Sequence, residues 1–262
     1  MLEYEFMRHA LLAGALVALL AGATGYFLVL REQTFAGHAL SHVGFAGATG
    51  AALLGVPPLL GMFAVTLAGG VAMGALGERV KGRDIAIGTV LALSLGFGML
   101  FLHFFTAYAA QATALLFGNI LGVDGSTLVL LAASSVLCLC ALAAIARPLV
   151  FASLQPDLAE ARGVSPRRVS ILFLAIVAVA TAQCIQIVGV LLVFALMVGP
   201  GAAAQQLTCR LARGVGLAMV LALAQTGGGI VLAYCSDWPV SFWITLLSAG
   251  TYLGAVLWRR RH

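Results

Sequence analysis

The sequence is poor in charge. Asp, Glu, Lys and Arg make up 9% of its 262 residues, whereas hydrophobic residues make up 62%. A soluble domain of this length needs charge at about a quarter of its positions to cover its surface. The apolar residues form continuous runs of about the 20 residues that a helix needs to cross a membrane. A membrane β-barrel would instead alternate apolar and polar residues. The composition therefore predicts an all-α, polytopic bundle of transmembrane helices.

Common catalytic motifs are also absent. The chain has no GxxxxGK[ST] phosphate-binding loop, no HExxH and no GxSxG, so it lacks the usual machinery for hydrolysing ATP, peptides or esters. Its five cysteines include no CxxC pair, and we interpret them as small buried hydrophobic residues. No basic patch is interleaved with aromatic residues. We therefore expect no enzyme, no permanently bound cofactor and no nucleic-acid partner.

Acidic residues are missing from the apolar runs. Carriers coupled to protons or sodium usually keep a carboxylate at membrane depth as a partner for the coupling ion. This absence counts against a secondary carrier, so active transport would draw its energy from another subunit. All nine acidic residues lie in loops or at the ends of the runs: Glu3, Glu5, Glu32, Glu78, Asp84, Asp124, Asp157, Glu160 and Asp237.

Nine membrane spans can be drawn, and fusing two of them would give eight. The weakest division lies in the run 169–208, which must fold back near residues 186–189. Every basic residue except Arg8 follows an odd-numbered span, so the positive-inside rule places the N-terminus outside and the C-terminus in the cytoplasm. We interpret residues 1–262 as a single transmembrane domain. The expected spans are 10–30, 38–55, 58–77, 85–105, 126–146, 169–186, 188–208, 214–234 and 241–258.

One cytoplasmic connection, about 147–168, is longer than a turn requires. Between two of its prolines lies a short predicted helix that begins near Asp157 and ends near Arg162. An acid at the start, a base at the end and Gly163 as a stop all suit the helix dipole and the C-cap preference. A charged helix of this kind predicts a docking element for another protein, presenting these residues and Glu160. A solvated loop without a partner is the alternative.

Two histidines occupy the interior of the second span. His38 and His42 are four residues apart, which places their Cβ atoms on one helix face about 5–6 Å apart. Counted from Arg31, a rise of about 1.5 Å per residue places His42 about 16 Å deep, near the membrane midplane. Polar residues there are functional by default, and imidazole binds zinc, copper, iron and nickel. Two ligands are too few for a structural zinc site, but they suit an ion in transit. The alternative is a structural pair whose rings form hydrogen bonds with backbone carbonyl groups or with Ser41.

His103 lies near the outer end of the fourth span. It fits either a further pathway ligand or an interfacial structural role.

Three parts of the sequence resemble the permease subunits of the ABC-3 family, which import zinc, manganese or iron in bacteria. Residues 37–47, GHALSHVGFAG, resemble the family pattern GDALSH followed by a Pro-Gly. Residues 116–121, LFGNIL, resemble LFGDIL. The third part combines residues 156–164, 188–193 and 200–204. The resemblance follows the order of the chain and covers nearly all of it.

The resemblance implies an inner-membrane permease that pairs as a homodimer. It also implies two cytoplasmic ATPase subunits docked through residues 153–166, and a periplasmic or surface-tethered metal-binding protein. His42 would match the pathway histidine of the family. His38 and Asn119 stand where the family has Asp, and Ala46 stands where Pro is usual. Replacing a hard carboxylate oxygen by imidazole at position 38 favours zinc over manganese.

The sequence thus leads us to expect the permease subunit of an ATP-driven metal-ion importer. Its transported cargo would be a divalent metal, preferably zinc, with manganese or iron as alternatives. Two other functions stay open. One is a self-sufficient secondary carrier or channel for metals, and the other is a permease for a larger chelate such as a siderophore or cobalamin.

Overall fold

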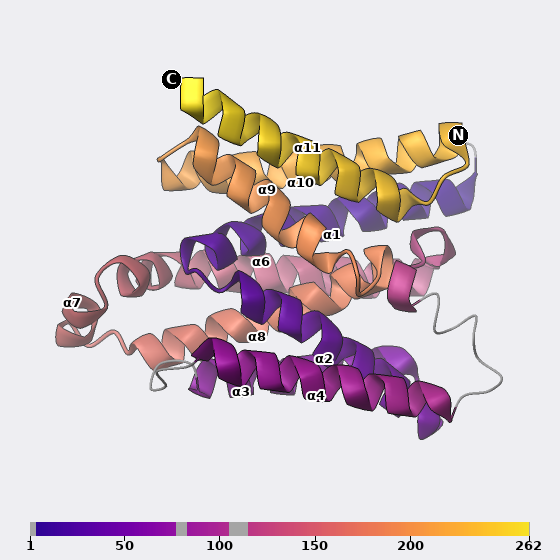
Figure 1. Ribbon diagram of the computed structural model, residues 1–262, viewed down its shortest axis with the longest axis horizontal. Coiled ribbons are helices and arrows are strands. Elements are labelled where there is room, and N and C mark those ends of the chain that lie inside the picture. Colours follow the sequence, from indigo (N-terminus) through magenta and orange to yellow (C-terminus); the bar gives the residue numbers. More distant parts are fainter. Residues whose placement is uncertain (1–3, 77–82, 105–114, 262) are drawn as a thin grey trace. The chain divides into compact units, whose positions relative to one another are not determined.

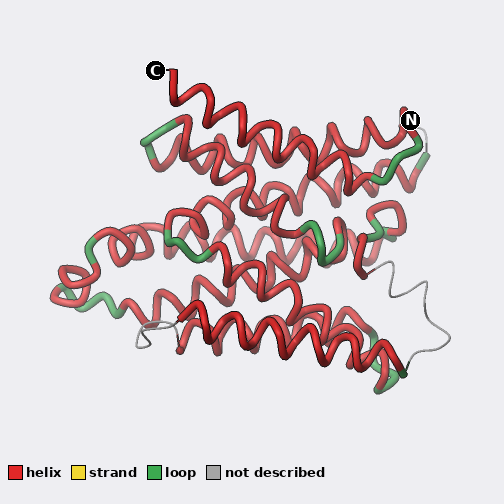
Figure 2. The backbone as a smooth tube through the Cα atoms, viewed as in Figure 1, coloured by secondary structure: helices red, strands yellow, loops and turns green. Residues whose placement is uncertain are grey.

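The computed structural model describes residues 4–76, 83–104 and 115–261, and within these residues it consists of helices and loops (Figure 2). The predicted all-α fold class is confirmed for this part of the chain. The helices are α1 (Glu5–Leu30), α2 (Thr34–Leu53), α3 (Pro58–Leu76), α4 (Arg83–His103), the 3-10 helix η1 (Ile120–Gly122), α6 (Gly125–Leu154), α7 (Pro156–Ala161), α8 (Pro166–Val188), α9 (Val193–Leu207), α10 (Leu211–Ser236) and α11 (Val240–Arg261).

Each expected span overlaps one long helix among the described residues. Six of these helices, α1, α3, α6, α8, α10 and α11, are long and apolar enough to cross a membrane. Shorter apolar helices lie at Ile87–His103 and Val193–Leu207. α2 carries the two histidines, which lower its hydropathy, and it is not among the six. The chain is therefore a multi-pass helical membrane protein, while nine spans and their orientation stay predictions.

The helix of the fifth span extends beyond the expected end of that span. We expected that span to end at residue 146, but α6 continues through Pro148 to Leu154, so residues 147–154 of the expected connection are helical. Proline removes one backbone hydrogen bond from a helix. The side chains of Leu149 and Ala152 are buried on the same stretch, and their packing outweighs that loss. Tertiary contacts here override the local preference.

Two other local predictions are confirmed. The short helix of the connection is α7, and the chain leaves it at Gly163 with a φ of +81°. The long run 169–208 folds back where expected, because α8 ends at Val188 and Gly189 follows with a φ of +82°. Glycine adopts this left-handed conformation without the strain that a side chain would add.

The chain divides into two compact units, and each is described by itself. Unit 1 comprises Met1–Thr34, Ala114–Val136 and Gln183–His262, and unit 2 comprises Phe35–Thr113 and Leu137–Ala182. In unit 1, α9 packs against α1, α10 and α11, and α1 also packs against α10 (Figure 1). The backbones of α1 and α9 touch at two glycines. A Cβ on Gly25 would overlap the carbonyl oxygen of Met197, and a Cβ on Gly201 would lie 2.8 Å from the carbonyl carbon of Gly25. Small residues of this kind let membrane helices approach closely.

In unit 2, α2 packs against both α3 and α4. A Cβ on Gly47 of α2 would lie 2.6 Å from the carbonyl oxygen of Gly61 on α3, and a Cβ on Gly98 of α4 would lie 2.6 Å from the ring of Phe45 on α2. α3 in turn packs against α8 through Gly74. Glycine-mediated contacts with two neighbouring helices therefore hold α2, the helix that carries the two histidines.

Candidate functional site

The histidine pair lies on one face of α2, as its spacing predicted. The imidazole rings of His38 and His42 are 5.0 Å apart between centroids and meet edge to face at 86°. Both side chains are half-buried, whereas their neighbours Ala39, Leu40 and Ser41 are buried. The Nδ1 atom of His42 is buried and has no hydrogen-bond partner in the described structure. An unpaired buried polar atom is costly, and such atoms often mark a site for a ligand or water.

Ser41 does not satisfy this ring. Its hydroxyl donates a 2.7 Å hydrogen bond to the backbone carbonyl oxygen of His38, one turn earlier in the same helix. A serine bonded back to its own helix satisfies its donor locally. The hydrogen of this hydroxyl is therefore directed to the backbone of α2 and not to the Nδ1 atom of His42.

The separation of the rings suits a shared metal ion. An ion at about 2.1 Å from an imidazole nitrogen lies about 3.2 Å from the ring centroid, so two imidazoles at a tetrahedral angle have centroids about 5.2 Å apart. The rings of His38 and His42 are 5.0 Å apart. In the described part of the chain, no group of three or more His, Cys, Asp or Glu side chains could hold a metal. The two-ligand ion site therefore stays a prediction, in which water or other oxygen atoms would complete the coordination.

The ring contact found for His103 is with Phe104 and not with the histidine pair. His103 ends α4, it is exposed, and its ring packs against that of Phe104 at 5.8 Å. The predicted role as a further pathway ligand is not tested by this geometry and stays a prediction.

The predicted docking residues lie on one exposed element. Asp157, Glu160, Arg162 and Gly163 are all exposed, while Ala159 is fully buried and holds α7 in place. Sequence reasoning missed one further residue of this surface. Leu158 is 47% exposed among the charged side chains. The sequence could have indicated it, because a large apolar side chain within a short charged helix is a sign of a contact surface.

A second notable arrangement joins two segments of unit 1, residues 115–119 and residues 186–191 at the end of α8. The backbone N–H of Asn119 donates to the carbonyl of Gln186 at 3.1 Å, and that of Val190 donates to the carbonyl of Leu115 at 3.1 Å. At the crossing, Gly118 has a φ of +78°, and a Cβ there would lie 2.6 Å from the backbone carbonyl carbon of Val188.

This crossing explains one of the family-like segments. The Oδ1 atom of Asn119 accepts a 3.1 Å hydrogen bond from the backbone N–H of Gly122 and caps η1. Capping requires only an acceptor oxygen, which an amide supplies as well as a carboxylate. Ser241 joins the loops to α11, because its hydroxyl lies 2.9 Å from the carbonyl oxygen of Phe117.

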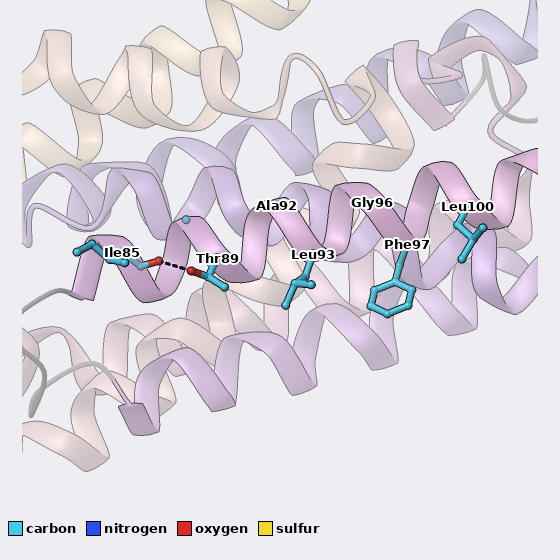
Figure 3. Close-up of a pocket in the computed structure, with 8 residues that line it drawn as sticks. Ile85, Thr89, Ala92, Leu93, Gly96, Phe97 and Leu100 are labelled. Atoms are coloured by element: carbon cyan, nitrogen blue, oxygen red, sulfur yellow. Dashed lines mark hydrogen bonds between the residues drawn. The ribbon is translucent and has the colours of Figure 1, made fainter.

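No histidine lines two of the hollows in the described part of the chain. One, of about 380 Å³, adjoins the loop crossing, and no acidic or histidine side chain lines it. The other, of about 640 Å³, runs along α4. Figure 3 shows its apolar lining, which includes Leu93, Phe97 and Leu100, and its one hydroxyl, on Thr89, donates to the carbonyl of Ile85 at 2.8 Å. Such a surface suits lipid or another helix better than a hydrated cation.

Comparison with known proteins gives a consistent result. Residues 3–259 match the model of a family described as the ABC 3 transport family. A protein of Haemophilus influenzae named "Probable iron transport system membrane protein" is 29% identical over 99% of this chain and 96% of its own. The manganese transport system membrane protein MntC of Halalkalibacterium halodurans is 28% identical over 90% of this chain and 82% of its own. Among solved structures, PsaBC from Streptococcus pneumoniae in complex with Fab has the same fold, with a TM-score of 0.86 at 22% identity over 96% of this chain and 91% of that one.

Proposed function

Because the chain belongs to the ABC 3 transport family, we propose that it is the permease subunit of an ATP-driven importer of divalent metal ions. It is a multi-pass protein of a bacterial inner membrane and a transport component, not an enzyme. Relatives named for iron and manganese transport align with most of its length. The importing cycle would be alternating access, powered by ATP binding to partner subunits.

The observation that carries this proposal is the pair His38 and His42. Neutral imidazoles bind a divalent ion without neutralising its charge. An ion held by two such ligands in a low-dielectric setting is bound weakly enough to leave again, as conduction requires. In the described residues, the acidic side chains lie at helix ends and in loops, so no carboxylate along the helices would trap the ion.

We infer a preference for zinc from the chemistry of His38 alone. The relatives named for iron and manganese are 29% and 28% identical to this chain, so the comparisons single out no metal. Imidazole is a borderline donor that suits zinc and iron, whereas carboxylate oxygen suits manganese.

The substitution His38→Asp tests this preference. The added carboxylate supplies a hard oxygen ligand, so we expect the ratio of manganese to zinc uptake to rise about tenfold. The measurement is competitive uptake of the two ions by cells that express the variant. An unchanged ratio would remove His38 as a determinant of selectivity, and His38→Asn, which is isosteric with Asp but uncharged, is the matched control.

The proposed topology has nine spans, with the N-terminus outside and the C-terminus in the cytoplasm. It is supported by the overlap of each expected span with a long helix and by the one-sided distribution of arginines. Arg79 and Lys81, which the same argument uses, lie outside the described residues. In this topology α7 faces the cytoplasm, and the loop crossing at Gly118 and Gly189 faces outward.

The proposed partners are two cytoplasmic ATPase subunits, an external metal-binding protein and a second copy of the chain. The ATPase subunits are supported by α7. This helix exposes Leu158 among charged side chains, and its Ala159 is buried against the rest of the protein. A large apolar residue ringed by charges is a common arrangement in protein interfaces.

The substitution Leu158→Arg tests docking at α7. We expect the amount of ATPase that co-purifies with the tagged chain to fall about tenfold or more, because a buried apolar contact is replaced by an unpaired charge. Leu121→Arg is the matched control, since Leu121 is 45% exposed and Leu158 47% exposed. Equal ATPase recovery from the two variants would contradict docking through α7.

The two alternative functions make different predictions in uptake assays. A self-sufficient carrier would move zinc into liposomes that contain this chain alone. A chelate permease would move a siderophore or cobalamin whose uptake an excess of free zinc does not inhibit. Under our proposal, uptake requires the ATPase, and free zinc competes for it.

A further inference from the structure

At one end of unit 1, α1 and α9 end, α10 begins and α11 ends (Figure 1). Three of these helix ends, those of α1, α10 and α11, carry arginines. The described members of this set, which we call the arginine cluster, are Arg31, Arg210, Arg213, Arg259 and Arg260.

Three contacts hold these helix ends together. The side-chain amide of Gln205 on α9 donates to the backbone carbonyl of Tyr26 on α1 at 2.9 Å. The guanidinium of Arg259 on α11 donates to Oε1 of Gln206 on α9 at 2.8 Å. Gly214 on α10 packs so closely on the ring of Tyr26 that a Cβ there would lie 2.5 Å from the ring. The cluster is therefore a property of the packed bundle and not only of the sequence.

Three members of the cluster carry exposed positive charge. Arg210, Arg213 and Arg260 are exposed, and the described structure shows no ion pair for them. Arg259 is bonded to a neutral amide. Among the described acidic residues of unit 1, only Glu32 lies beside this end. A mobile anion in solution screens such a cluster only in part.

The cluster also adjoins the apolar outer surface of α11. Leu253 and Leu257, 58% and 57% exposed, lie seven and three residues before Arg260 and therefore on the same helix face. Trp258, 61% exposed, stands beside the arginines, and tryptophan favours the headgroup level of a membrane. A ligand that binds this cluster must therefore be able to approach it from within the membrane.

We propose that the arginine cluster binds the phosphate headgroups of anionic phospholipids. Guanidinium groups form two parallel hydrogen bonds to one phosphate, and arginines near an anionic membrane surface are attracted to its lipids. The acyl chains of such a lipid would lie along the exposed face of Leu253 and Leu257. This inference does not rest on the identity of the transported ion.

The test compares two charge-matched variants of the full-length, detergent-purified protein. In R210Q/R213Q/R260Q the cluster loses three charges, while Arg259 and its bond to Gln206 are kept. The control R147Q/R167Q/R168Q removes three exposed arginines of unit 2. Binding of phosphatidylglycerol is measured by titration, with phosphatidylcholine and glycerol 3-phosphate as further ligands.

We expect the affinity for phosphatidylglycerol to fall about tenfold or more in the cluster variant and less than about twofold in the control. Phosphatidylcholine and glycerol 3-phosphate should bind weakly to every form. An equal loss in both variants, or none in either, would overturn the proposal. So would a cluster variant that keeps its lipid affinity but loses the ATPase, because the surface would then belong to a protein partner.

A second measurement uses the unmodified protein, so that it does not depend on the folding of a variant. Phosphatidylglycerol with a photoreactive headgroup is crosslinked in nanodiscs, and the labelled peptides are identified by mass spectrometry. The proposal predicts label at the start of α10 and the end of α11. Label confined to peptides of unit 2 would contradict it.

Discussion

Replacing both His38 and His42 by alanine should reduce metal uptake by about a hundredfold or more. Changes to residues that only support a metal ligand already lower affinity by about 10–100-fold, and this variant removes two ligands. The two imidazoles lie side by side, 5.0 Å apart, and among the described residues no third His, Cys, Asp or Glu is grouped with them to take their place. Uptake of zinc by cells in which this variant is the only copy of the chain provides the measurement.

The control for this variant is His9→Ala. His9 lies on α1 in unit 1, where its ring is 4.0 Å from the carboxylate of Glu5, and it should tolerate the change with unaltered uptake. Membrane abundance and ATPase co-purification should be the same for all three proteins. Normal uptake by the double variant would show that His38 and His42 do not lie on the path of the ion.

Adding a single methyl group to Gly25 should destabilise the protein severely. The new Cβ would overlap the carbonyl oxygen of Met197, so α1 and α9 would have to move apart along their whole contact. Overpacking of a tight interior costs about 1–3 kcal/mol, and contact with a rigid backbone places Gly25→Ala at the upper end of that range. The melting temperature of the purified protein in detergent measures the effect.

Gly250→Ala makes the same chemical change where space is open. Gly250 lies within α11, and outside the adjoining backbone of that helix no described atom lies within 4 Å of the position of a Cβ there. Alanine is favoured over glycine inside a helix by about 1 kcal/mol, so this variant should be as stable as the original or slightly more stable. If the two variants had equal melting temperatures, the close contact of α1 with α9 would be refuted.

Local chemistry made part of the fold predictable. Continuous apolar runs marked the long helices, and Gly163 and Gly189 marked two of the chain reversals because both adopt a left-handed conformation. The end of α6 was not predictable in this way. The preference of Pro148 is local, whereas the burial of Leu149 depends on residues distant in the sequence.

The candidate site was predictable only in its outline. The spacing of His38 and His42 dictates a shared helix face, and the rings do meet. The unpaired Nδ1 of His42 and the bond of Ser41 to its own helix depend on rotamers that spacing does not specify. The crossing of residues 115–119 with residues 186–191 was hidden for a different reason. It joins segments about 70 residues apart, and no periodicity in the sequence reports such a contact.

The central claim is that His38 and His42 form the ion path of a permease driven by a separate ATPase. The most direct measurement is uptake of radioactive zinc into liposomes that hold the chain with the ATPase and the binding protein that co-purify with it. The account predicts uptake that requires both partners and ATP, and that is lost in the His38→Ala, His42→Ala double variant. Zinc uptake by the chain alone, or full uptake by the double variant in the complete complex, would contradict it.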